Sequence, residues 1–358
     1  MVRERTRRRL RTFLWVLLAG TAVGIGYGSL IGFAGWGAPV LGGLIGAIHG
    51  LTIAACIGLL EIFASRTPVG RRLERAPLAV TIVVKGLVYG SVVAAVELGN
   101  LGERLIRGQP SDPLPHFLPL SVVFSFVFTF IFIFVLHVSR LVGGRTLRDL
   151  VLGRYHGPRA EDRFFLFVDV VGSTGSAQRI GPLGMHRFLN RVFSLAADPV
   201  ADHHGEIYQY VGDEMVVTWT VRHGRIGARP IACFFAIDHA LSTASGMFDR
   251  DFGVVPAIRG ALHAGAVVTG EVGESKRDIV FHGDVMNTAS RLEQAARDLG
   301  HQLLVSGDAR RLLGSGDAYR FSDLGPQTLR GRTGSVEVFA VTRTSPAPPH
   351  QRTATDRG

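Results

Sequence analysis

Long apolar stretches separated by short polar ones dominate the first 142 residues of the chain. Four of them reach the length of about 20 residues that a helix needs to cross a bilayer. They are Phe13–Phe33, Val40–Phe63, Leu78–Glu97 and Phe117–Val138. The last stretch has phenylalanine at every second position from Phe124 to Phe134, which resembles a strand, but both faces are apolar and the stretch is too long for one strand. The pattern therefore predicts a four-helix transmembrane bundle.

Arginine sets the expected orientation of these helices. It gathers before the first stretch, between the second and third, and after the fourth, at Arg3, Arg5, Arg7, Arg8, Arg9, Arg11, Arg66, Arg71, Arg72, Arg75, Arg140, Arg145 and Arg148. Because basic loops stay in the cytoplasm, we expect both termini on the cytoplasmic side of the inner membrane. A signal peptide is the alternative for the first stretch, but three more spans follow and no clear small-residue cleavage site ends it. The basic N-terminus is expected to face anionic lipid and not nucleic acid.

Glycines recur at every fourth position in the first two stretches, at Gly20, Gly24, Gly28, Gly32, Gly42, Gly46 and Gly50. Small residues on one helix face let two backbones approach closely, so we expect packing within the bundle, with dimerisation as the alternative. Ionisable groups inside a span are costly in lipid and often functional. His49 and Lys85 are the candidates for a sensing role.

The pattern changes near residue 143. Residues 143–162 are polar and basic and are expected to connect the membrane domain, 1–142, to a second domain at 163–342. That domain alternates strand-like and helix-like segments, which predicts an α/β sandwich with one helical layer. We expect the first strand at Arg163–Val171 and strand pieces in Ala257–Glu271 broken by Gly265 and Gly270. Residues 343–358 are expected to be disordered.

Composition supports this division. Charged residues make up 19% of the chain and the mean hydropathy is +0.25, whereas soluble proteins carry about 25% charge. The net charge is +10, and nearly all the positive charge is arginine, since Lys85 and Lys276 are the only lysines. Two cysteines, Cys56 and Cys233, exclude a disulfide scaffold and a cysteine-rich metal site.

Three short motifs carry candidate chemistry. Asp169 ends an apolar strand, and the small-residue turn Gly172–Thr174 behind it offers backbone N–H groups to phosphates. Asp213 lies at the tip of a predicted hairpin, and two converging carboxylates can hold Mg²⁺. Asn287 and Arg291 lie one helical turn apart on one face, which suits a donor pair directed at a phosphoryl group. Alone, each motif is also what an ordinary turn or a solvated helix face contains.

The segments FVDVVGST, VGDE and GDVMNTASRLE, in this order, resemble the catalytic domain of class III nucleotidyl cyclases over about residues 160–342. The resemblance implies an α+β, ferredoxin-like fold and a homodimer with two sites at its interface. It implies two Mg²⁺ or Mn²⁺ ions per site, with metal ligation at Asp169, Val170 and Asp213. It further implies that Asn287 orients the ribose and that Arg291 stabilises the transition state. The implied nucleotide-binding positions are Gly172, Ser173, Thr174, Gln209, Val280 and Arg332.

The positions that read the base depart from the family pattern. Members that select adenine commonly have Lys four positions before the second metal aspartate, where this chain has Gln209. They commonly have Asp or Thr seven positions before the orienting asparagine, where this chain has Val280. Gln209 can donate and accept hydrogen bonds at a base edge, whereas Val280 can only pack. The resemblance predicts conversion of ATP to 3′,5′-cyclic AMP and pyrophosphate, with GTP as the alternative substrate.

Three other functions compete with the cyclase hypothesis. A membrane receptor with a degenerate, cyclase-like dimerisation module would explain the altered base positions, but not the retention of Asp169, Asp213, Asn287 and Arg291. A transporter is disfavoured because the spans lack paired broken helices. A diguanylate cyclase is disfavoured because its Gly-Gly-Asp/Glu-Glu-Phe signature is absent from Val211–Met215.

Overall fold

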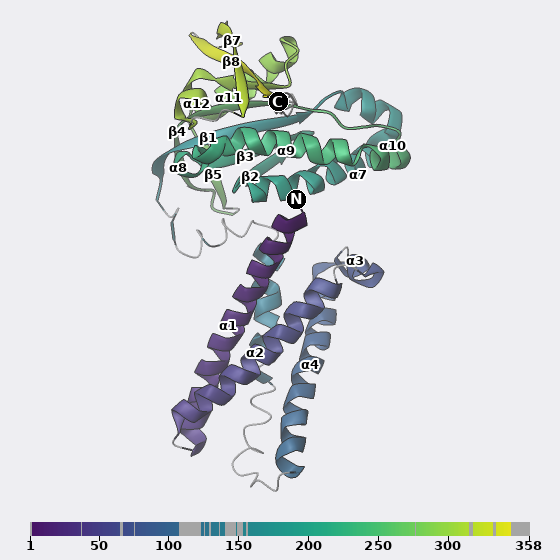
Figure 1. The fold of residues 1–358 in the computed structure, drawn as a ribbon, viewed down its shortest axis with the longest axis vertical. Coiled ribbons are helices and arrows are strands. Elements are labelled where there is room, and N and C mark those ends of the chain that lie inside the picture. The colour runs from purple at the N-terminus through teal and green to yellow at the C-terminus, as the bar shows by residue number, and fades with distance from the viewer. Residues whose placement is uncertain are drawn as a thin grey trace, which may run out of the picture. The chain divides into compact units, whose positions relative to one another are not determined.

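The computed structural model describes residues 2–36, 38–64, 67–74, 76–106, 157–275, 277–314, 318–331 and 334–344, with short pieces between 123 and 154. The chain divides into two compact units, Met1–Leu147 and Arg148–Gly358. Figure 1 shows a helical first unit and a second unit built around a sheet.

The first unit consists of long apolar helices. They are α1 (Val2–Trp36), α2 (Pro39–Ala64) and α4 (Leu78–Ile106), with the short helix α3 (Pro68–Glu74). Each long helix contains a segment long and apolar enough to cross a membrane, namely Phe13–Ala34, Pro39–Leu60 and Ala79–Val96. The first three predicted spans are thereby confirmed as apolar helices. The fourth, Phe117–Val138, lies partly outside the described residues; its described part after residue 122 is helical, and its crossing of the membrane stays a prediction.

Glycines hold α1 against α2. A methyl group on Gly24 would collide with the backbone carbonyl of Gly46, and one on Gly28 would collide with that of Gly42. Gly26, by contrast, has open space where a side chain would begin. Close packing of the two backbones is what the four-residue glycine spacing predicts. The expected packing within the bundle is therefore confirmed for these two helices.

Eight strands of the described residues form one mixed sheet in the second unit, in the order β2-β3-β1-β4-β6-β8-β7, with β5 paired to β4. The strands are β1 (Arg159–Val170), β2 (Glu206–Val211), β3 (Glu214–Thr220), β4 (Ile258–Val272), β5 (Asp278–His282), β6 (Leu303–Ser306), β7 (Tyr319–Thr328) and β8 (Ser335–Arg343). The helices are α7 (Ser173–Asp202), α8 (Val221–Gly224), α9 (Arg229–Thr243), α10 (Ser245–Phe252), α11 (Asp284–Asp298) and α12 (Gly307–Leu312). The run β1-α7-β2-β3-α9-β4, with β1 antiparallel to both β3 and β4, is the ferredoxin-like arrangement that the resemblance implied.

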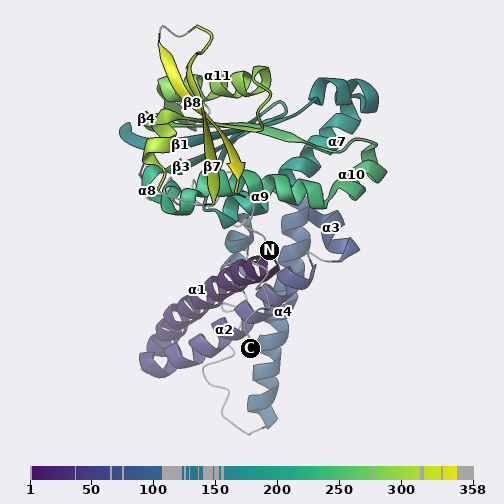
Figure 2. The same cartoon turned by 45° about the horizontal axis from the view of Figure 1, so that its top comes forward.

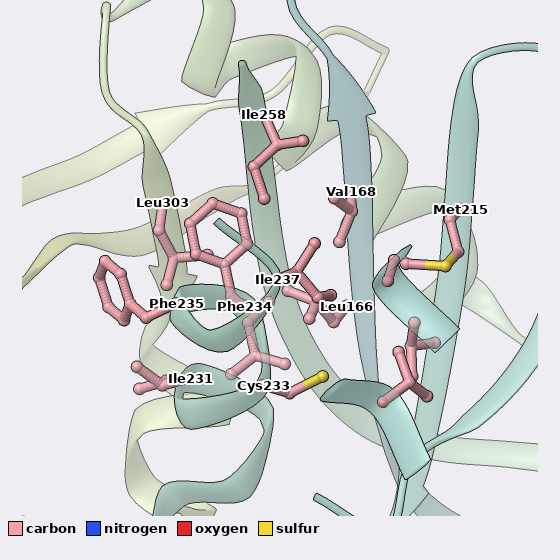
Figure 3. Close-up of a cluster of buried hydrophobic side chains, with 14 of the residues drawn as sticks. Leu166, Val168, Met215, Ile231, Cys233, Phe234, Phe235, Ile237, Ile258 and Leu303 are labelled. Atoms are coloured by element: carbon pink, nitrogen blue, oxygen red, sulfur yellow. The ribbon is translucent and has the colours of Figure 1, made fainter. Parts of the chain in front are cut away.

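Helices cover both faces of this sheet. The even-numbered side chains Phe164, Leu166 and Val168 of β1 pack in the cluster that includes α7 and α9, part of which Figure 3 shows. The odd-numbered Phe165 and Phe167 pack against α11 on the other face, and Figure 2 shows α11 and α9 on opposite sides of the strands. The expectation of one helical layer is wrong, because a strand that is apolar at successive positions must be covered on both faces.

Two strand boundaries also differ from expectation. β1 begins at Arg159 and not at Arg163, because residues 159–162 continue the ladder with β4. β4 is one strand from Ile258 to Val272 and is not broken at Gly265. A methyl group on Gly265 would lie 2.8 Å from the Val285 side chain, so this glycine makes room for α11. The tail predicted to be disordered lies, from residue 345 on, outside the described residues.

Candidate active site

Asp169 stands near the end of β1 on the face that α11 covers. The alternation of the strand places it there after Phe165 and Phe167, and it is 5% exposed. Its neighbours across the sheet are Glu214 in β3 and Arg259 in β4. The first metal ligand predicted from the sequence is therefore a nearly buried carboxylate at a strand end.

Asp213 lies in the tight turn between β2 and β3. Gly212 supplies the turn with a positive φ of 62°, a conformation that glycine adopts without strain. The carboxyl of Asp213 lies close enough to that of Asp169 for its charge to raise the pKa of Asp169. The structure thus brings together the two carboxyl groups that are far apart in the sequence.

Two further carboxyl groups, missed by the sequence analysis, join this pair. Glu214 follows Asp213 and lies opposite Asp169. Glu293 projects from α11, is 5% exposed, and its Oε1 atom has no hydrogen-bond partner among the described residues. A signal for Glu293 was present, since it follows Ala289 by four residues and precedes Ala296 by three, which places it on the apolar face of the helix.

The crowded carboxyl groups shift one another's protonation. Burial, followed by the charge of Asp213, raises the pKa of Asp169 above its usual value, and Arg297 only partly offsets this. Burial and then the Asp169 charge raise the pKa of Glu293. Burial and the neighbouring carboxylates raise the pKa of Glu214 to about 7. Such a cluster is costly in its ionised form, and perturbed carboxyl groups of this kind gather at functional sites.

Arg297 is in direct contact with this cluster. Its Nη2 atom lies 3.2 Å from Oδ2 of Asp169 and 3.9 Å from Oε1 of Glu293. Only the first of these distances allows a hydrogen bond. Arg297 could not be singled out from the sequence, because an arginine in the last turn of a helix also suits the helix dipole.

Asn287 and Arg291 occupy a different stripe of α11. Asn287 is exposed, and Arg291 donates a hydrogen bond from Nη1 to the Gly331 carbonyl at 3.1 Å. Because each residue of a helix advances by about 100°, this stripe lies about 120° around the helix from Glu293 and Arg297. One stripe of α11 therefore serves the chain's own carboxylates and the other is directed elsewhere.

The turn after β1 leads directly into α7. Gly172 has a positive φ of 70° and precedes the first helical residue, Ser173. Gly172 and Thr174 are exposed and Ser173 is half-buried. The first backbone N–H groups of a helix lack partners within the helix and favour anions such as phosphate. The predicted phosphate-binding turn therefore lies a few residues beyond Asp169.

The predicted base-reading segments lie close together. The rings of Tyr208 in β2 and Phe281 in β5 meet edge to face with their centroids 4.8 Å apart. Their sequence neighbours are Gln209, which is exposed, and Val280, which is half-buried. Arg332 lies outside the described residues.

Comparisons with known proteins agree with this architecture. The family model described as "Adenylate and Guanylate cyclase catalytic domain" matches residues 158–343. Adenylate cyclase 2 of Rhizobium meliloti (strain 1021) is 34% identical over 84% of this chain and 84% of its own length. Adenylate cyclase 1 of the same organism is 26% identical over 85% of this chain and 47% of its own length.

Among solved structures, a bacterial light-regulated adenylyl cyclase shares the fold. It aligns with a TM-score of 0.52 and 19% identity, over 63% of this chain and 64% of that one. The family match covers the whole sheet, including the end of β1 where the carboxyl groups meet. From this match over more than half of its length, we conclude that the chain belongs to the adenylate and guanylate cyclase family.

Proposed function

We propose that this protein is a membrane-anchored adenylate cyclase that converts ATP to 3′,5′-cyclic AMP and pyrophosphate. The observation that carries the proposal is the meeting of Asp169 and Asp213 at the end of β1, in a chain 34% identical to Adenylate cyclase 2 over 84% of its length. Three apolar helices of membrane-spanning length support the anchoring.

The residues at this site fit Mg²⁺ or Mn²⁺. Burial and mutual repulsion among Asp169, Glu214 and Glu293 create an excess of negative charge that Arg297 and Arg259 only partly offset. Among the described residues, His, Cys, Asp and Glu side chains form no group of three that could hold a metal. Mg²⁺ is commonly bound by one or two carboxylates, with water and substrate phosphates completing its shell. We assign Asp169, Asp213 and the backbone carbonyl of Val170 as the protein ligands of two ions.

The reaction needs no protein nucleophile. The ribose 3′-hydroxyl attacks the α-phosphorus and pyrophosphate leaves; the bound cations would lower the pKa of that hydroxyl and neutralise phosphate charge. Asn287 orients the ribose, and Arg291 neutralises charge that grows in the transition state, a role worth about 10³–10⁵ in rate in other phosphoryl-transfer enzymes. The turn Gly172–Thr174 donates backbone hydrogen bonds to the phosphates, and Arg332 binds the polyphosphate.

The active unit in this proposal is a homodimer. Asn287 and Arg291 lie on the stripe of α11 that is turned away from Asp169, whereas Glu293 and Arg297 face it. One chain would therefore supply the metal-binding carboxylates, and a second copy would supply the asparagine and arginine. The dimer would contain two such sites, related by its two-fold symmetry.

We propose ATP as the substrate because Adenylate cyclase 2 of Rhizobium meliloti, 34% identical to this chain, is an adenylate cyclase by name. GTP is the second candidate, since Gln209 and Val280 replace the residues common in adenine-selecting members. The distribution of arginine around the apolar helices supports an inner-membrane protein with both termini and the catalytic domain in the cytoplasm. A lipid bilayer and a second copy are thus the expected partners, and nucleic acid is not.

Product formation by the purified full-length protein in detergent micelles tests this function. With Mn²⁺ and either ATP or GTP, we expect more cyclic AMP than cyclic GMP by mass spectrometry. Asp169→Asn should form neither product while remaining folded, because it removes a metal ligand and relieves charge repulsion. Asp308→Asn, which changes an exposed aspartate paired with Arg311, is the matched control and should stay active.

Each outcome of this assay has a distinct meaning. Wild-type turnover by Asp169→Asn would refute the metal assignment. If the wild-type protein forms neither product, the cyclase assignment is refuted and the hypothesis of a non-catalytic receptor is favoured. Equal or faster formation of cyclic GMP would refute ATP as the preferred substrate and leave the cyclase assignment in place.

A further inference from the structure

Arg297 occupies one oxygen of the carboxylate that is the first proposed metal ligand. Its Nη2 atom donates a hydrogen bond to Oδ2 of Asp169 at 3.2 Å. A divalent cation bound by Asp169 would need the lone pairs of the same carboxylate, and the guanidinium charge would repel it. The ion pair in its observed position therefore opposes the binding of a cation at Asp169.

A second acceptor is ready for Arg297 on its own helix. Glu293 precedes it by one turn, and Oε1 of Glu293 lies 3.9 Å from Nη2 of Arg297. That oxygen is buried and has no hydrogen-bond partner among the described residues. A buried acceptor without a donor is costly, so a small movement of Arg297 toward Glu293 would satisfy it.

Movement of the Arg297 side chain from Asp169 to Glu293 should cost little free energy. The Arg297 side chain is 61% exposed, and a long arginine side chain on a surface changes rotamer readily. Both positions keep the guanidinium paired with a carboxylate.

We infer that Arg297 is a mobile counter-ion, which holds the Asp169 carboxylate in the metal-free protein and transfers to Glu293 when a divalent cation binds. This inference rests on the proposed metal site. Arg297 and Glu293 are positioning residues in this scheme, because neither touches the nucleotide. The device keeps a buried acidic cluster compensated in both states.

The opposite role, a fixed arginine that orients Asp169 as a ligand, predicts the opposite sign. A competing arginine weakens metal binding, so its removal tightens binding. An orienting arginine strengthens metal binding, so its removal weakens it. Metal affinity therefore separates the two roles without any use of activity.

Mn²⁺ binding to the full-length protein in detergent micelles, followed by the electron paramagnetic resonance signal of free Mn²⁺, gives this affinity. We expect Arg297→Gln to lower the Kd for Mn²⁺ by about tenfold, because a unit positive charge paired with the proposed ligand Asp169 is removed. Glu293→Gln should raise the Kd, and by a larger factor in the wild-type background than in Arg297→Gln. Arg311→Gln is the matched control and should leave the Kd unchanged, since Arg311 is an equally exposed arginine that also contacts two carboxylates, Asp308 and Glu337.

An unchanged or higher Kd in Arg297→Gln would overturn the inference, as would an equal effect of Glu293→Gln in both backgrounds. If Arg297→Gln fails to fold, Arg297→Lys replaces it, because a lysine keeps the charge but holds the carboxylate with fewer donors. We expect Arg297→Lys to lower the Kd for Mn²⁺ by a smaller factor than Arg297→Gln. An unchanged Kd in Arg297→Lys would overturn the inference.

Asp169→Asn separates this inference from the proposed function. If that variant binds Mn²⁺ as the wild type does, the metal site itself is wrong; if it loses binding while Arg297→Gln does not tighten it, only the counter-ion is wrong.

Discussion

Asp169 is nearly buried beside Asp213, Glu214 and Glu293, and burial followed by the charge of Asp213 raises its pKa. Like charges that share a buried site destabilise the ionised protein. A chain selected for stability alone has little reason to keep four carboxyl groups at the end of one strand. The arrangement is understandable if the cluster serves to attract cations, and the proposed metal site follows from it.

Gln209 offers a residue-scale test of base recognition. Loss of one neutral hydrogen bond to the base edge should lower kcat/KM for ATP by about threefold to tenfold in Gln209→Ala. The ratio of ATP turnover to GTP turnover should also fall toward one. Gln302→Ala is the matched control, since Gln302 is an exposed glutamine that donates to Asp238 at 2.9 Å in another part of the domain. If the ratio of ATP to GTP turnover is unchanged in Gln209→Ala, this residue does not take part in recognition of the base.

At the residue scale, the sequence was informative where a functional residue interrupts a regular pattern. Asp169 ends a strand of apolar residues and Asp213 follows a turn glycine, so both could be selected from the sequence. Arg297 and Glu293 could not be paired with Asp169, because that contact depends on the angle at which α11 crosses β1. Spacing along a helix says which residues share a face but not which strand that face meets.

At the scale of elements, runs of apolar residues predicted the buried central strands, whereas an exposed edge strand was not predicted. The central strands β1 and β3 carry continuous apolar runs and could be predicted to within a few residues. β7 (Tyr319–Thr328) was not predicted, because half of its residues are exposed, none is fully buried, and it contains Gly325 and Pro326. A strand at the sheet edge, as β7 is, needs few apolar side chains and tolerates proline.

The packing of α1 on α2 can be tested with a pair of glycines on the same helix. Gly24→Leu should destabilise the membrane unit by about 1–3 kcal/mol, the usual range for overpacking, because its side chain would enter the α2 backbone. Gly26→Leu should have little effect, since nothing lies within 4 Å of the position of its first side-chain atom. Thermal unfolding in detergent, followed by size-exclusion chromatography, measures both. Equal losses in the two variants would contradict the α1–α2 contact.

At the scale of the whole molecule, one helix carries two stripes with separate tasks. Glu293 and Arg297 of α11 reach the Asp169 cluster of their own chain, whereas Asn287 and Arg291 lie about 120° away around the helix. A single chain that needed all of these groups in one site would place them on one face. The division explains why a second copy is required in the proposed mechanism. It also implies that two different inactive variants can complement each other.

Complementation between Asp169→Asn and Arg291→Ala is the most direct test of this account. Each variant alone should form no cyclic nucleotide, because every site in its homodimer lacks either a metal ligand or the transition-state arginine. When the two are co-expressed at equal levels, half of the dimers are mixed and each has one intact site, so activity should return to about a quarter of the wild-type value. A co-expressed pair that is folded, associated and still inactive, beside an active wild type, would contradict the claim that the site is shared between two copies.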